Sequence, residues 1–286
     1  MPSAPMSAAQ LGLFDDWTLR LQRVRRVLLE SLDLESALEE LSTLAARGPD
    51  SEIAALLETV TGLQRDLDLE LGKDGDPVAA LLRLEPAVPP WLVPGWCRYL
   101  TLEAERRDGT GCRIGDESAG WYFLRAGDLD EAERSLRATL ARDPKVGRSR
   151  ARLGDVLARK GATTAARTEY LAACLTGPRT MDWAQITDTE VAALPSIVAS
   201  EHQVAESPED WAAALGTIEG LWPFAHPELP GLAAAEGEPA EAGLRFYALL
   251  CQERAAGRDL ARRARIRRQM KALCPSLLAA YLEKWL

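Results

Sequence analysis

The sequence has few of the residues that build sheets, metal centres or disulfide frameworks. Only four phenylalanines and five tyrosines occur among 286 residues, and valine and isoleucine do not cluster in alternating runs. The only histidines, His202 and His226, have no cysteine or second histidine at ligand spacing. The five cysteines are dispersed, and none forms a CxxC pair. We therefore predict no β fold, no metal and no cofactor, and we expect buried or half-buried free thiols.

Long apolar runs and a secretion signal are also missing. No segment approaches the ~20 apolar residues that a membrane-spanning helix needs. No basic stretch followed by an apolar one precedes Phe14. The sequence therefore predicts a soluble, cytoplasmic protein without a membrane partner. Residues 1–10 offer little to pack and are expected to be disordered.

Catalytic motifs are absent as well. The sequence contains no GxSxG, no HExxH, no Walker-type loop and no GxGxxG after a predicted strand. The glycines in Gly109-Thr110-Gly111 have no strand before them, so a nucleotide-binding turn is not indicated. We predict no catalytic residues and no enzyme.

What is present is a helical composition with an internal repeat. Alanine, leucine, arginine and glutamate dominate, and 47% of the residues are apolar. Six positions between residues 113 and 180 recur after 34 residues, where Gly120, Phe123, Gly127, Ala132, Leu136 and Pro144 return as Gly154, Leu157, Gly161, Ala166, Tyr170 and Pro178. A fixed period of this length predicts stacked helical hairpins. The small residues let two helices cross closely, and the large ones fill the space around the crossing.

This segment resembles two tetratricopeptide repeats in tandem, although Asp116 and Arg150 stand where that family usually carries tryptophan. The resemblance implies an all-α fold, a right-handed α-solenoid of helical hairpins with capping helices at both ends. We expect degenerate hairpins over residues 11–112, the two repeats over 113–180, and a C-terminal helical region with a basic capping helix over 181–286. In the first repeat the first helix is expected to include Ile114 and Ser118.

A stripe of charged residues is the candidate binding site. Arg148, Arg152, Asp155 and Arg159 are spaced by four, three and four residues, so they share one side of a helix. One repeat earlier the matching stripe includes Trp121 and Arg125. In tetratricopeptide-like arrays the first helices line the concave face, so the resemblance places these partner-binding residues in the groove. The partner expected there is a protein or peptide segment, acidic with an apolar anchor. A second interpretation stays open, in which the stripe is a solvated face and Asp155 pairs with its arginine neighbours.

The charge is unevenly distributed along the chain. The net charge is −9, yet the residues between Cys251 and Cys274 carry eight basic and two acidic side chains. Overall acidity disfavours nucleic acid as a partner of the whole surface, whereas the basic segment is either a capping helix or a strip for an acidic partner or nucleic acid.

These observations predict a protein-binding adaptor or an assembly chaperone. Two alternatives remain open: a regulatory protein that contacts nucleic acid through the C-terminal basic helix, and an accessory subunit of an enzyme complex.

Overall fold

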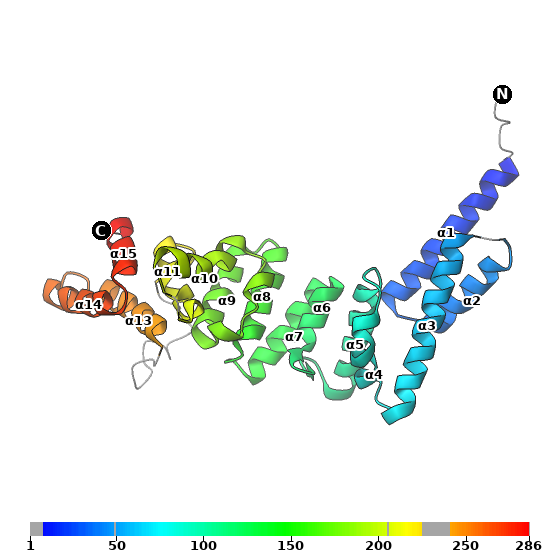
Figure 1. Cartoon of the computed structure of the whole chain (residues 1–286), viewed down its shortest axis with the longest axis horizontal. Coiled ribbons are helices and arrows are strands. Elements are labelled where there is room, and N and C mark those ends of the chain that lie inside the picture. Colours follow the sequence, from blue (N-terminus) through cyan, green and yellow to red (C-terminus); the bar gives the residue numbers. More distant parts are fainter. Residues whose placement is uncertain (1–7, 49, 205, 225–240, 286) are drawn as a thin grey trace, which may run out of the picture. The chain divides into compact units, whose positions relative to one another are not determined.

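A computed structural model describes residues 8–48, 50–204, 206–224 and 241–285, with side chains from Trp17 onward. The described residues form 14 α-helices and one two-stranded sheet with two residues per strand, so the predicted all-α fold is confirmed (Figure 1). The chain divides into two compact units, Met1–Asp128 and Leu129–Leu286, and each is described by itself. Residues 1–7 of the predicted disordered N-terminus lie outside the described residues, and a helix already begins at Ala8.

The first unit contains six helices. Their bounds are α1 Ala8–Glu30, α2 Leu34–Ala45, α3 Ser51–Asp74, α4 Pro77–Leu84, α5 Val93–Asp108 and α6 Ala119–Ala126, with a 3-10 turn η1 at Glu85–Ala87. Aspartates start three of them, because the carboxylates of Asp33, Asp50 and Asp76 accept backbone N–H groups from the first turns of α2, α3 and α4.

Consecutive helices of the first unit pack on one another, and α1 also packs on α5. The α1–α5 contact depends on Gly95, where an added Cβ atom would lie 2.3 Å from the backbone oxygen of Leu28. Its neighbour Trp96 is fully buried and donates its indole N–H to the Leu81 carbonyl at 3.1 Å. A glycine therefore brings two backbones together where a tryptophan fills the space beside them.

A short hairpin replaces the expected start of the first repeat. Strands β1, Arg113–Ile114, and β2, Glu117–Ser118, pair antiparallel with Arg113 opposite Ser118. The prediction that Ile114 and Ser118 lie on the first helix is wrong, because both belong to this hairpin. Gly109, Gly111 and Gly115 all adopt positive φ and turn the chain here. The first helix of the repeat, α6, is thus only eight residues long.

The second unit contains the remaining described helices. Their bounds are α7 Leu129–Arg142, α8 Gly147–Arg159, α9 Thr163–Thr176, α10 Thr189–Glu201, α11 Ala212–Glu219, α13 Ala242–Ala255, α14 Leu260–Leu273 and α15 Pro275–Trp285, with 3-10 turns η2 Pro178–Thr180, η3 Trp183–Gln185 and η4 Pro208–Trp211. Helices α8 and α9 form the predicted second hairpin. At its crossing an added Cβ on Gly154 would lie 2.6 Å from Cε1 of Tyr170, so a side-chain ring, rather than a neighbouring backbone, occupies the space that the glycine leaves.

A buried carboxylate joins the last three helices. Glu253 on α13 is fully buried and accepts hydrogen bonds from Arg263 Nε at 2.8 Å, Arg267 Nη2 at 2.6 Å and the Tyr281 hydroxyl at 2.5 Å. Arg263 and Arg267 lie on α14 and Tyr281 on α15, so one side chain fixes both helices against α13. Burial alone would raise the pKa of Glu253, but these three donors together hold it below its ordinary value.

Candidate functional site

Trp121 and Arg125 lie on α6 in the first unit. Trp121 is half-buried and packs against the apolar core of that unit. Arg125 forms an ion pair with Glu85, and its guanidinium lies 5.8 Å from the centre of the Tyr122 ring. Both side chains are therefore partly committed to contacts within their own unit.

The stripe on α8 in the second unit is largely covered. Arg152 and Asp155 are only 3% and 1% exposed, so the alternative of a solvated face does not hold for these two. The pairing that this alternative included is present, with Arg152 Nη1 3.8 Å from Asp155 Oδ2. Their partner-binding role stays a prediction. Oδ1 of Asp155 accepts from the Tyr170 hydroxyl at 2.7 Å and from the Thr187 backbone N–H at 2.8 Å. Burial raises the pKa of Asp155. The segment after α9 covers this side of α8, and helical spacing carries no information about that covering.

Two members of the stripe keep access to solvent. Arg148 is half-buried and its Nε donates to the Thr180 carbonyl at 3.0 Å. Arg159 is exposed at the end of α8, and no ion pair of it is found among the described residues. Trp121 and Arg125 belong to the first unit and the other four predicted residues to the second, so the structure describes them as two separate groups.

Because Trp121 packs against the core, its removal should destabilise the fold. We expect Trp121→Ala to lower the free energy of unfolding by roughly 1–3 kcal/mol, less than the ~3–5 kcal/mol of a fully buried aromatic. The measurement is thermal melting followed by circular dichroism. Trp91→Ala, at a 40% exposed tryptophan, is the control and should melt close to the parent. Equal melting of the two variants would show that Trp121 does not support the core.

An apolar cleft lies on α3 in the first unit. It has a volume of about 660 Å³, and most of its exposed lining is apolar. Small and aliphatic residues make up much of its lining: Ala45, Ala54, Leu57, Gly62, Leu63, Ala87 and Pro89. Glu58, Arg65 and Asp66 line it as well, and Arg65 is paired with Asp66 at 3.1 Å. The cleft thus combines apolar walls with charged residues.

A second cleft of about 500 Å³ lies on the same helix and shares Thr59 with the first. Trp91 lines it and is exposed, and the ion pair between Arg25 and Glu52 forms another part of its wall. Trp91, rather than the predicted Trp121, is therefore the tryptophan that faces solvent most. The two clefts together, called the α3 clefts below, flank the middle of one helix.

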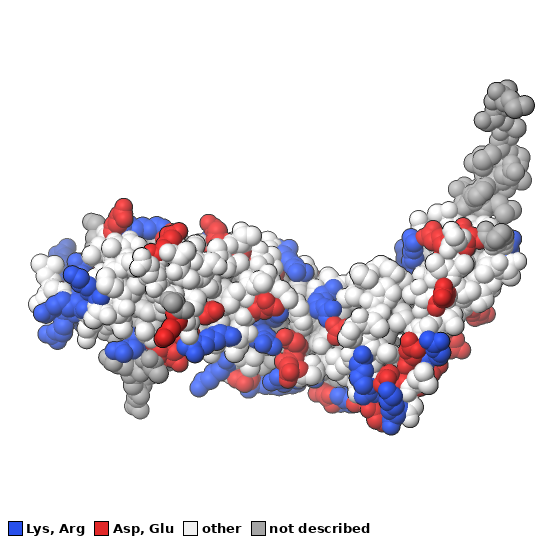
Figure 2. Space-filling model, viewed as in Figure 1, with Lys and Arg blue, Asp and Glu red and all other residues white. Residues whose placement is uncertain are grey.

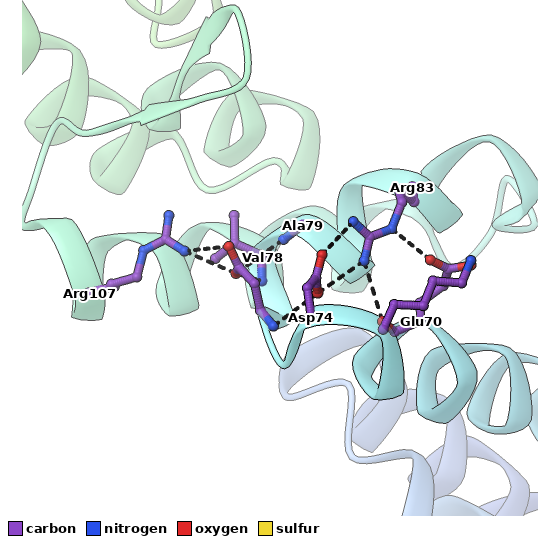
Figure 3. A network of polar contacts seen from close by, with 8 residues as sticks. Glu70, Asp74, Val78, Ala79, Arg83 and Arg107 are labelled. Carbon is purple, nitrogen blue, oxygen red and sulfur yellow. Dashed lines mark hydrogen bonds and ion pairs between the residues drawn. The ribbon is translucent and has the colours of Figure 1, made fainter.

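A polar network fixes the C-terminal end of α3 (Figure 3). Arg83 of α4 donates to Glu70 at 2.6 Å and to Asp74 at 3.0 Å, and Arg107 of α5 donates to Asp76 at 2.9 Å. Hydrogen bonding from Lys73 lowers the pKa of Glu70, and hydrogen bonding from Arg83 lowers that of Asp74. The acids and bases of this network bond to one another, so it holds α3 in place beside α4.

The α3 clefts have only weak indications in the sequence. Ala54, Ala55 and Gly62 are small residues on one helix, and Pro89-Pro90 precedes Trp91, but neither pattern shows which neighbours are absent. A cleft is an absence of side chains between elements far apart in sequence. Only the packed helices reveal it.

The remaining candidates from the sequence are the two histidines, the five cysteines and any metal or membrane-spanning segment. His202 is half-buried at the end of α10, and His226 lies outside the described residues. Four cysteines are buried and Cys251 is half-buried, all with free thiols, which confirms the expectation for them. Within the described ranges no three His, Cys, Asp or Glu side chains are grouped as metal ligands would be. None of the described helices combines the length and the apolar character that crossing a membrane requires.

Comparison with known proteins identifies the centre of the chain. Residues 118–179 match the tetratricopeptide repeat family. The comparisons with curated proteins and with solved structures found no match. Repeats of this family generally mediate protein–protein interaction, which is the general function that the match indicates. The chain thus carries a tetratricopeptide repeat segment at residues 118–179 within an all-α fold.

Proposed function

We propose that this protein is a non-enzymatic adaptor or assembly chaperone that binds a segment of a partner protein in the α3 clefts. The apolar cleft around Gly62 carries the proposal. It is large enough for several side chains, and its walls are mostly apolar. Helical repeats commonly receive an amphipathic segment in this way, with its apolar residues in a groove.

The charge of the first unit selects the chemistry of the partner. Residues 1–128 contain 22 acidic and 13 basic residues, so this unit accounts for the whole net charge of −9. Glu58 on the cleft rim is exposed, and no ion pair of it is found among the described residues. Complementary charge favours a segment with apolar anchors flanked by lysine or arginine. The acidic partner expected from the sequence depended on the α8 arginines, of which Arg152 is buried.

Filling the cleft should block the partner without harming the fold. Gly62 lies within α3, and an added Cβ meets no atom within 4 Å. Gly62→Leu should therefore keep or raise the melting temperature, since glycine is a poor helix residue. The probes are three labelled peptides of equal length. Each contains leucine together with one other residue type, which is arginine, glutamate or serine, and binding is measured by fluorescence anisotropy. We expect the arginine peptide to bind the parent most tightly and to lose more than about tenfold in affinity on Gly62→Leu.

Gly72→Leu provides a matched control. Gly72 lies on the same helix, also has nothing within 4 Å of an added Cβ, and does not line the clefts. This variant should bind the arginine peptide like the parent. Preferential binding of the glutamate peptide, abolished by Arg159→Glu and not by Gly62→Leu, would overturn the proposal and place the site on α8.

A further inference from the structure

Helix α14 carries exposed basic side chains that form no ion pair within the described part of the chain. On the helix these are Arg262, Arg265, Arg268 and Lys271, and Arg258, two residues before its start, joins them; all five are exposed, and no ion pair of any of them is found within the described part of the chain. Figure 2 shows basic side chains gathered at the left of the view, where Figure 1 labels α14. The helix has no acidic residue, while nearby Asp259 caps its first turn and Glu253 is buried beneath it. Nothing acidic on the helix offsets these cations.

Most other basic side chains of the protein have an acidic partner. Arg83, Arg98 and Arg167, for example, each bond to carboxylates. On α14 the same holds only for the inward pair Arg263 and Arg267, which bond to Glu253. These two bonds fix the rotation of the helix on its neighbours. The outward cations are therefore presented in a set orientation, which lowers the entropy cost of binding.

The cations cover one half of the helix. A step of three residues turns the direction of a side chain back by about 60°, so residues 262, 265, 268 and 271 together span about 180°. The opposite half, with Ile266 and Met270, is buried against the protein. Between the cations stand Ala261, Ala264, Gln269 and Ala272, all exposed and none acidic. The three alanines let a ligand surface approach the helix axis closely.

We propose that the exposed half of α14 binds the phosphate backbone of double-stranded DNA, with the helix lying along the major groove. That groove is wide enough to admit an α-helix and has phosphates on both sides, which suits cations spread over about 180°. A single acidic peptide would contact one line of charge instead. A membrane surface would need a free apolar face, whereas Ile266 and Met270 are buried and Leu260 is the one large apolar residue of the helix that is exposed. The major groove of double-stranded RNA is too narrow for a helix.

The test measures how binding of a labelled 20-base-pair DNA duplex to the full chain depends on salt. If five cations neutralise phosphates, log K should fall with log salt at a slope of about −4.5, or about 500-fold between 50 and 200 mM salt. Arg265→Glu with Arg268→Glu should weaken binding more than about tenfold and reduce the slope to about −2.7. Melting should stay unchanged, because neither side chain has an ion-pair partner among the described residues.

A charge-matched control is Lys145→Glu with Arg159→Glu, which reverses two exposed cations elsewhere in the same unit. It should leave DNA affinity and slope close to the parent. Equal loss in the control and the α14 variant would overturn the proposal, since binding would then follow net charge alone. Tighter binding of polyglutamate, double-stranded RNA or phosphatidylserine vesicles than of the DNA duplex would also overturn it. The α3 clefts lie on the other unit, so failure here leaves the adaptor function standing.

Discussion

Replacing Glu253 by alanine should lower the free energy of unfolding of the second unit by about 3 kcal/mol. Breaking a buried ion pair by removing one partner typically costs about 3–5 kcal/mol, because the remaining charge is left without compensation. The low end applies because Arg263 and Arg267 are 20% and 31% exposed and regain some contact with water. The buried Tyr281 hydroxyl loses its acceptor as well. Thermal melting should show a loss of about 6–12 °C for a unit of this size.

Two further variants separate the carboxylate from its surroundings. Glu283→Ala removes an exposed glutamate on α15 with no ion pair among the described residues, and it should melt like the parent. Glu253→Gln keeps the shape and one acceptor but presents an amide N–H group to two arginines, so it should also be destabilised. A Glu253→Ala melting curve that matches Glu283→Ala would show that the carboxylate does not hold the three helices together.

The effect of Glu253 depends on pH in a defined direction. Its pKa is lower in the folded chain than its ordinary value of 4.5, so the stabilising contribution is fully present above pH 4.5. It is lost as the pH falls through the folded pKa. The difference in stability between the parent and Glu253→Gln should therefore shrink below pH 4.5.

Gly154→Leu should be the most damaging single change in the repeat segment. The new Cβ would meet the Tyr170 ring at 2.6 Å, and the ring cannot move aside without stretching its hydrogen bond to buried Asp155. Overpacking costs about 1–3 kcal/mol, and a hydrogen bond to a charged group about 1.5–3 kcal/mol. We expect a loss of roughly 3 kcal/mol or more in urea unfolding. Gly72→Leu, at an open helical position, should cause none.

A double-mutant cycle tests the reason. Tyr170→Phe removes the hydroxyl that ties the ring to Asp155, so the ring can shift more easily. Gly154→Leu should therefore cost less in the Tyr170→Phe chain than in the parent. An identical cost in both backgrounds would show that the tether to Asp155 does not restrain the ring.

Features that depend on residues close together in the sequence were predictable. The recurring glycines Gly127 and Gly161 adopt positive φ and turn the chain between helices, and Asp50 caps α3. The crossing at Gly154 followed from the recurrence of small residues at one period. These predictions succeed because each depends on a few neighbouring residues or on a contact within one hairpin.

Features that depend on distant segments were not predictable. Arg152 and Asp155 lie on one helix side, as their spacing indicated, but Thr187 and its neighbours cover that side. The spacing of charged residues along α8 does not indicate that another segment covers them. Likewise the exposure of Trp91 depends on which side chains of α1 and α3 surround it. The basic segment was visible in the sequence, whereas the division between inward Arg263 and outward Arg265 depends on buried Glu253.

The contact between α1 and α5 joins the first and last of five successively packed helices, so α1 to α5 form a closed cycle of contacts. Each of α1 to α5 packs on its successor, and α5 packs back on α1, where Arg98 donates to the Leu29 carbonyl across 69 residues. Closing so long a loop costs about 1.2 kcal/mol more entropy than joining helices a quarter as far apart in sequence. In return, no helix in the cycle is a free end that can fray alone. Opening any one of the five helices breaks contacts on two sides, so the cycle favours cooperative unfolding over gradual loss from its ends.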